Sequence, residues 1–368
     1  MIQLRTIFRG QSIGKPKSLR SLRSRSQRAI LAFAVIYLAA TVGFQSSVFR
    51  THLEWIDTRT PPRLRELKTL ASNAGSRSLV IALGSSRSEM GLAAPAVNRP
   101  SAAPEILVYN WSIPGGGPYR DLIELVRLLD SGVKPQAVLI EILPAQLGSQ
   151  SRHHADDLLR DFPATIRTAD FEALRPYLKK SASSSVNVLR ARLSFWSYAA
   201  NGMLLKSSPS FASEKTKQDR SPQLGMGQGW HPYVRPNMSR EEHQSRWAQA
   251  EREYRSEMEQ FELDPEIRHV FIDIAERCRM QKIGVACYLL PESPRFRKWT
   301  SLKSATQIRT FTESLTQDYG ILIFDTSEWI DDESAFADGH HLLHHAALPF
   351  TEQFARTFLK PWIASLRE

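Results

Sequence analysis

Five short apolar runs follow one another along the chain, at residues 78–83, 106–110, 137–142, 285–290 and 321–325. Each run is bounded by turn or helix signals, and its hydrophobicity is continuous rather than alternating. A parallel strand that is covered on both faces requires this pattern. Because amphipathic stretches lie between the runs, the strand–helix order predicts an α/β three-layer sandwich with a five-stranded parallel sheet.

The amphipathic stretches are expected to be helices at residues 122–129, 267–280 and 306–317, with a terminal helix at 346–359. The stretch at 147–265, between the third and fourth strands, breaks this rhythm and is interpreted as an insertion. It contains a Ser/Lys-rich part at 207–221 that we expect to be flexible, a Gly/Trp/Pro segment at 225–237 and a charged helix at 239–260. Insertions at this end of a sheet often shape a binding site.

The net charge of +10 is concentrated at the N-terminus. The first 28 residues hold eight basic and no acidic side chains, so removing these eight charges from the ten leaves +2 for the rest of the chain. A basic nucleic-acid-binding surface on the domain is therefore disfavoured, and we expect no nucleic-acid partner.

The basic tail at 1–28 leads into an uncharged run at 29–49, which is long enough for a helix to cross the ~30 Å hydrocarbon layer. Basic residues on its N-terminal side predict a single-pass anchor in the cytoplasmic (inner) membrane with the N-terminus inside. Residues 50–77 are then a juxtamembrane stalk, and residues 78–368 form the α/β domain on the extracytoplasmic side. A cleaved signal peptide is the alternative, disfavoured because the leader and the apolar run are both longer than usual.

The chain has two cysteines, Cys278 and Cys287, so a disulfide scaffold is excluded. Outside the cytoplasm a single disulfide between them is chemically allowed. Two buried free thiols are the alternative that we favour.

Polar residues suited to chemistry follow the first two strands. Ser85 and Ser86 follow the first strand at the start of a helix, where converging N–H groups can support a nucleophile; simple helix capping would also explain them. Asn110 and Gly115 follow the second strand. A glycine there lets a backbone N–H approach a ligand closely, or only forms a turn.

After the fifth strand, Asp338 stands three residues before His341 in a run that also holds His340, His344 and His345. An acid at this spacing can orient an imidazole as a general base. The i,i+4 histidine pairs also suit metal ligands, and histidines without a role are common. Together the three features fall at the carboxyl edge of one parallel sheet and supply the groups that acyl transfer needs.

This arrangement resembles the SGNH/GDSL hydrolase superfamily, and in particular its membrane-anchored, SGNH-like proteins of bacterial envelopes. The resemblance implies a flavodoxin-like αβα sandwich. The family's Gly-Asp-Ser block matches Gly84-Ser85-Ser86, which makes Ser86 the nucleophile and puts Ser85 in place of the usual Asp.

The family's second block falls on Asn110 and Gly115, so the resemblance implies an oxyanion hole made by the N–H groups of Ser86 and Gly115. Its Asp-x-x-His block falls on Asp338 and His341, which completes a Ser-His-Asp triad. His340 is then a bystander.

One block departs from the family. Where Gly-x-Asn-Asp is expected the chain has Leu143-Pro144-Ala145-Gln146, so Ala145 replaces an oxyanion donor whose loss typically costs about 10²–10³ in rate. Gln146, or Arg87 beside the nucleophile, is a candidate replacement. Arg87, Asn110, Gln146 and Trp230 are our candidates for substrate binding; Trp230 either stacks on a sugar or belongs to a packed aromatic cluster.

The sequence therefore predicts a membrane-anchored serine esterase or O-acyl(acetyl)transferase that acts on an envelope or extracellular polysaccharide ester. Its partners are an acylated carbohydrate or other ester, and the membrane. The alternative is a non-catalytic SGNH-like domain that binds or scaffolds envelope components, which Ala145 favours. A metal protein built on the histidine cluster is a third class, but we expect no metal and no cofactor.

Overall fold

The computed structural model of the protein describes residues 19–51, 57, 59–99, 105–149, 151, 154–161, 165–178, 227–234 and 238–367. The predicted flexible part at 207–221 and most of the predicted basic tail lie outside these residues. The chain divides into two compact units, Met1–Leu53 and Glu54–Glu368.

The first unit contains α1 (Leu19–Thr51), which includes the apolar run at 29–49. Among the residues that the structure describes, no helix has a stretch both long enough and apolar enough to cross a membrane.

The second unit is built on a five-stranded parallel sheet with the order β2-β1-β3-β4-β5. The strands are β1 (Ser78–Leu83), β2 (Ile106–Asn110), β3 (Ala137–Glu141), β4 (Gly284–Leu289) and β5 (Leu322–Asp325). Each predicted run forms a strand to within one residue at either end, so the α/β fold class is confirmed. The strand order reverses between β1 and β3, the point where α/β sheets of this kind open a crevice at their carboxyl edge.

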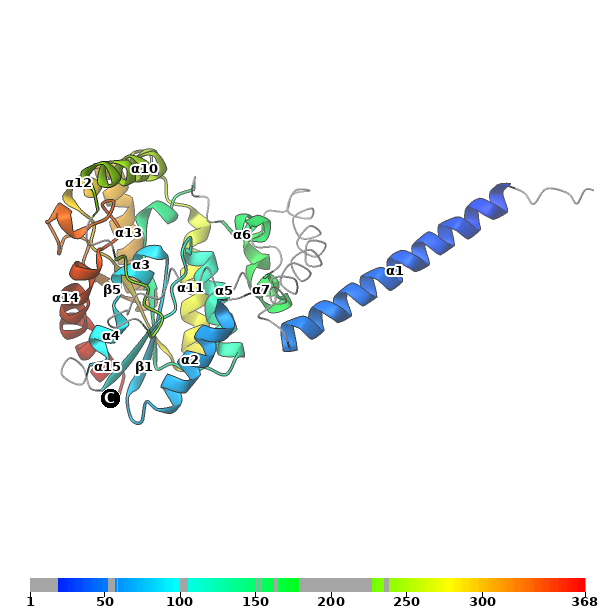
Figure 1. Cartoon of the computed structure of the whole chain (residues 1–368), viewed down its shortest axis with the longest axis horizontal. Coiled ribbons are helices and arrows are strands. Elements are labelled where there is room, and N and C mark those ends of the chain that lie inside the picture. Colours follow the sequence, from blue (N-terminus) through cyan, green and yellow to red (C-terminus); the bar gives the residue numbers. More distant parts are fainter. Residues whose placement is uncertain are drawn as a thin grey trace, which may run out of the picture. The chain divides into compact units, whose positions relative to one another are not determined.

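Helices cover both faces of this sheet (Figure 1). The α-helices of the first half are α2 (Thr60–Ser72), α3 (Ser86–Gly91), α4 (Ala94–Val97), α5 (Pro118–Asp130), α6 (Ala155–Asp161) and α7 (Thr168–Leu174). Those of the second half are α10 (Arg240–Glu259), α11 (Pro265–Met280), α12 (Pro294–Arg297), α13 (Leu302–Tyr319), α14 (His344–Phe354) and α15 (Lys360–Ser365), with a π-helical turn, Ala355–Leu359, between the last two. Short 3-10 helices lie at Pro144–Gln146, Arg175–Tyr177 and Glu333–Ala335.

Alternate residues of β1 face two different core layers. Leu79 and Ile81 belong to the layer that includes side chains of α2, α5, α11 and α13, whereas Val80 and Ala82 belong to the layer that includes α4, α14 and α15. Figure 1 shows α2, α5 and α11 on one side of β1, with α4, α14 and α15 on the other. Burial on both faces is the physical reason for the continuous hydrophobicity of the strands.

Helix α2 differs from the stalk predicted at 50–77. Its Leu67 is fully buried in the core, and its Arg63 donates a 2.6 Å hydrogen bond to the carbonyl of Asn110. The Arg63 guanidinium also lies 4.9 Å from the ring centre of Trp111, and burial lowers its pKa. These contacts make α2 part of the α/β unit, because it shares one core layer of the sheet with α5, α11 and α13.

Cys278 and Cys287 are both buried and free, so the favoured alternative of two buried thiols is confirmed. Burial raises the pKa of Cys278 to about 12 and that of Cys287 above its usual range. Neither thiol has the lowered pKa of a reactive cysteine.

Candidate active site

Ser86 is the first residue of α3 and the third residue after the end of β1. The preceding residue, Ser85, caps this helix, because its Oγ accepts a 3.2 Å hydrogen bond from the N–H of Arg87. The first N–H groups of a helix have no acceptor within it. The Ser86 N–H makes no hydrogen bond to any residue that the structure describes, so it remains available as a donor.

The structure brings Ser86, His341 and Asp338 into one chain of hydrogen bonds. Ser86 Oγ lies 2.8 Å from His341 Nε2, and His341 Nδ1 lies 2.8 Å from Asp338 Oδ2. Asp338 Oδ1 also accepts a 3.0 Å hydrogen bond from the backbone N–H of His341. The side chains of Asp338 and His341 are 14% and 15% exposed, so most water is excluded from the hydrogen bond between them.

The charge on Asp338 decides which nitrogen of His341 carries the proton. Burial opposes ionisation of the carboxyl, but the neighbouring imidazoles of His340 and His341 and the hydrogen bonds from His341 outweigh it, so the pKa of Asp338 lies well below its usual range. A carboxylate can only accept hydrogen bonds, so His341 Nδ1 must donate. Nε2 is then the acceptor and faces the hydroxyl of Ser86, as a general base requires.

The glycine loop after β2 lies against the turn that carries Ser86. Ile113 donates its N–H to the carbonyl of Gly84 at 2.9 Å, and a Cβ at Gly116 would stand 2.6 Å from the same oxygen. Gly116 is therefore required for this close approach. The N–H of the neighbouring Gly115 has no acceptor among the described residues, so the loop and α3 each leave one free donor, on Gly115 and Ser86.

Glu141, at the end of β3, holds the turn that carries Ser86, and it was not among the residues predicted from the sequence. Its Oε2 accepts hydrogen bonds from the N–H of Ser85 at 2.7 Å and from the hydroxyl of Ser88 at 2.6 Å. A Cβ at Gly84 would collide with the same oxygen, at 2.5 Å. The sequence signal for this role was an acidic residue at the end of an otherwise apolar strand. A carboxylate in such a place is buried, here to 4% exposure, and needs hydrogen-bond donors around it.

Arg87 is not positioned to bind substrate, contrary to our expectation. Its side chain is 1% exposed and points into the protein, where it donates to Glu292 Oε1 and to the carbonyl of Leu290, each at 3.0 Å. An arginine held in this way cannot replace the missing oxyanion donor. It instead links the nucleophile turn to the segment that follows β4.

Asn110 and Trp230 are likewise internal, so these two substrate-binding predictions are wrong. The Asn110 amide donates to the carbonyls of Ser88 and Leu92, at 2.7 and 2.8 Å, and is fully buried. Trp230 is 1% exposed and stacks on His344 with ring centres 5.4 Å apart, while its indole N–H donates to Met90. For Trp230, the alternative of a packed aromatic cluster is the one observed.

The position of the missing third block is apolar. Ala145 is 2% exposed and packs in a cluster with Trp247 of α10 and Phe296 of α12, so no side-chain donor stands there. Gln146 lies beside it, and its amide donates to the carbonyl of Gly116. Gln146 thus contacts the loop that carries Gly115 and holds it in place, rather than facing solvent.

Asp338, His340 and His341 could together hold a metal ion, the one such group in the part of the chain that the structure describes, with ligand atoms within 4.8 Å of one another. A metal there would compete with the hydrogen bonds that join His341 to Asp338 and Ser86. The i,i+4 histidine pairs considered from the sequence do not share a helix, because α14 begins only at His344.

The fold and this site define an α/β protein with a serine–histidine–aspartate hydrogen-bond chain at the carboxyl edge of its parallel sheet. The chain belongs to the family described as "Protein of unknown function (DUF1574)", whose model matches residues 62–354, from α2 to the end of α14. The comparison with curated proteins gave no match. Among solved structures, the chain is similar to "a putative acylhydrolase" from Bacteroides fragilis NCTC 9343, with a TM-score of 0.35, 10% identity, and coverage of 80% of this chain and 96% of that chain.

Proposed function

We propose that the protein is a serine esterase or O-acyltransferase in which Ser86, His341 and Asp338 act as a catalytic triad. The observation that carries the proposal is the pair of 2.8 Å contacts that link Ser86 Oγ to His341 and His341 to Asp338. A serine hydroxyl is a weak nucleophile on its own and gains reactivity when an oriented base accepts its proton. Helix capping does not explain Ser86, because Ser85 is the residue that caps α3.

In the first half-reaction, Ser86 Oγ attacks the carbonyl carbon of an ester while its proton moves to His341 Nε2. Asp338 stabilises the imidazolium that forms. The free N–H groups of Ser86 and Gly115 are the donors available for the developing oxyanion. When the tetrahedral intermediate collapses, the alcohol leaves with the proton from His341, and an acyl group remains on Ser86.

In the second half-reaction, His341 accepts a proton from an incoming hydroxyl, which attacks the acyl-enzyme and restores Ser86. Water as the acceptor gives an esterase, and a sugar hydroxyl gives an acyltransferase. We propose an acylated carbohydrate as the substrate. We also propose that the domain lies on the extracytoplasmic side of a membrane.

The experiment incubates the purified full chain with a fluorophosphonate probe and with p-nitrophenyl acetate. We expect wild type to label and to turn over the ester, Ser86→Ala and His341→Gln to lose both, and Asp338→Asn to lose about 10²–10⁴ in turnover. Ser314→Ala and Asp318→Asn on α13 are matched controls, since they change the same residue types at a distance from this site. A folded wild type that neither labels nor turns over the ester would contradict the proposal and leave a binding domain, as the loss of a donor at Ala145 suggests.

A further inference from the structure

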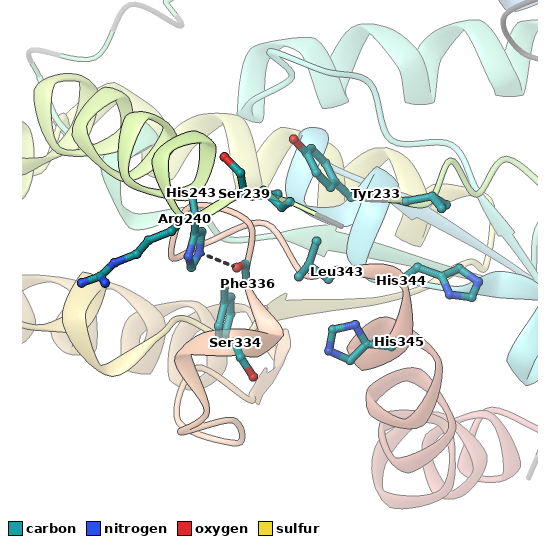
Figure 2. A pocket seen from close by; sticks show the side chains of 11 residues that line it. Tyr233, Ser239, Arg240, His243, Ser334, Phe336, Leu343, His344 and His345 are labelled. Carbon is teal, nitrogen blue, oxygen red and sulfur yellow. Dashed lines mark hydrogen bonds between the residues drawn. The ribbon is translucent and has the colours of Figure 1, made fainter. Parts of the chain in front are cut away.

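An open cavity of about 590 Å³ lies beside the triad, and neither Ser86 nor His341 lines it. Its walls come from the segment around Tyr233, from the start of α10, and from both arms of the loop that carries Asp338 and His341. Figure 2 shows these side chains around the hollow, with His243 joined by a hydrogen bond to the main chain of Phe336. No step of the proposed mechanism uses this space.

The cavity and the triad share one loop. Phe336 and Leu343 both line the cavity, and Asp338 and His341 lie between them in the sequence. An antiparallel bridge between Phe336 and Leu342 closes this loop at its base. Since consecutive Cα atoms are 3.8 Å apart, the Cα of Leu343 lies within about 7.6 Å of the Cα of His341. The cavity wall at Leu343 and the histidine of the triad are therefore two residues apart on the same loop.

Four basic side chains line the cavity: Arg240, His243, His344 and His345. No Asp or Glu is among the lining residues. Arg240 is exposed at the first position of α10 and makes no ion pair with any described residue. Asp332 interacts with two of the lining residues, because its pKa is lowered by its hydrogen bonds to Ser334 and, to a smaller extent, by His345. The Asp332 carboxylate is thus already bonded to Ser334 and does not enter the lining.

His243 is held firmly at the wall by its neighbours. Its Nε2 lies 3.2 Å from the indole nitrogen of Trp247, an N–H donor, and 3.2 Å from the carbonyl oxygen of Phe336, an acceptor. When Nε2 accepts from the indole N–H, the ring proton is on Nδ1, which is then a donor. The other ring nitrogen, Nδ1, has no hydrogen-bond partner in the part of the chain that the structure describes. Phe336 and Leu343 add apolar surface between these polar groups, as is usual for a site that binds a small organic molecule.

We infer that this cavity binds an anionic group, a carboxylate or a phosphate, of the molecule whose ester or acceptor hydroxyl reaches Ser86. The inference rests on the proposed function for the role of the bound molecule, but the binding itself does not depend on turnover. Arg240 supplies the permanent positive charge, and the histidines supply N–H donors to the anionic oxygens. A neutral sugar would leave the Arg240 guanidinium without an ionic partner.

The binding experiment uses the full chain with Ser86→Ala, which cannot turn over an ester, and isothermal titration calorimetry. Two matched pairs of probes are compared: oligogalacturonate with its methyl ester, and glucose 6-phosphate with glucose. We expect the anionic member of at least one pair to bind at least about 10-fold more tightly than its neutral partner. The pair that discriminates identifies the anion as a carboxylate or a phosphate.

Arg240→Gln is expected to weaken binding of that anion by at least about 10-fold. Arg252→Gln is the matched control, because Arg252 is an exposed arginine on the same helix that does not line the cavity. Equal affinity for the charged and neutral members, no binding of any probe, or equal losses in the two variants would overturn the inference.

The two proposals fail in different ways. If the fluorophosphonate probe does not label Ser86 but the anion still binds through Arg240, the proposed function is wrong and the cavity assignment stands. If Ser86 is labelled and turns over ester while charged and neutral probes bind alike, the function stands and the cavity assignment is wrong.

Discussion

His340 is packed against the ring of His341, with ring centres 4.1 Å apart, and is enclosed by Tyr254 and Phe296. Its side chain is 3% exposed. Nδ1 lies 3.3 Å from Asp338 Oδ1, but neither ring nitrogen makes a hydrogen bond with a described residue. Burial therefore holds the pKa of His340 well below its usual value of 6.5, with the positive charge of a protonated His341 acting in the same direction. At neutral pH, His340 is an uncharged ring that supports the general base.

This burial predicts how stability depends on pH. The unfolded chain takes up a proton on His340 below about pH 6.5, whereas the folded chain does not, so the stabilising contribution is present above that pH and is lost as the pH falls. Between pH 6.5 and 5, the free energy of unfolding of wild type should fall more steeply than that of His340→Phe, by up to about 1.4 kcal/mol per pH unit. Urea unfolding at several pH values measures both slopes, and parallel slopes would contradict the prediction.

At the scale of single residues, the sequence predicted where Ser86, Asp338 and His341 lie, because each follows a strand whose end is visible as the end of an apolar run. It could not predict which way Arg87 points. The partner of Arg87 is Glu292, which is 205 residues away along the chain. The spacing of motifs carries no information about a contact between residues so far apart in the sequence. The assumption that Arg87 is exposed, because it stands beside the nucleophile, was therefore wrong.

At the scale of elements, part of the insertion adds to the end of β2. Gln228 accepts a 2.9 Å hydrogen bond from the N–H of Asn110 and donates its own N–H to Glu66 of α2 at 2.7 Å. The next residue, Gly229, has a φ of 78°, and a Cβ there would stand 1.8 Å from the carbonyl oxygen of Asn110. Only a glycine can occupy this position without displacing β2.

Gly229→Ala should therefore lower the free energy of unfolding by about 3 kcal/mol or more, since strain in the backbone adds to a collision with main-chain atoms. Gly75→Ala is the matched control, because Gly75 has a similar φ of 62° but open space around the added Cβ. That variant should cost only about 1 kcal/mol. Equal losses in urea unfolding would show that the segment does not pack on β2 as described.

The strands and the helices between them could be predicted because each carries its own periodicity. The docking of Gln228 and Gly229 on β2 could not be predicted, because it depends on a main-chain hydrogen bond from Asn110, more than a hundred residues earlier in the sequence. Helix α10 was predicted almost to the residue from its charged pattern. Ala145, which stands where the family has an oxyanion donor, packs against α10. This contact depends on tertiary packing and could not be predicted from the sequence.

At the scale of the whole molecule, the α/β unit begins before its first strand. The unit covers Glu54–Glu368, and α2 contributes Leu67 to the core layer that it shares with α5 and α11. Tyr109 of β2 donates its hydroxyl to Glu66 of α2 at 2.8 Å, so the helix is bonded to the strand as well as packed on it. A charged, proline-containing segment resembles a linker when its apolar face is short, so the boundary predicted from the sequence falls at the first strand.

The position of this boundary can be tested by comparing two shortened chains with the full chain. A chain starting at Glu54 retains the whole compact unit and should unfold at the same temperature as the full chain, within about 2 °C. A chain starting at Ser78 loses α2, which exposes the part of the core layer that packs on Leu67 and leaves the carbonyl of Asn110 without the Arg63 donor. Removing a single buried leucine already costs about 2–5 kcal/mol, so this second chain should unfold at least about 10 °C lower or fail to fold. Circular dichroism gives the melting temperatures of the three proteins. Equal melting temperatures for both shortened chains would mean that residues 54–77 are a stalk. A lower melting temperature already in the chain that starts at Glu54 would mean that the unit begins before this residue.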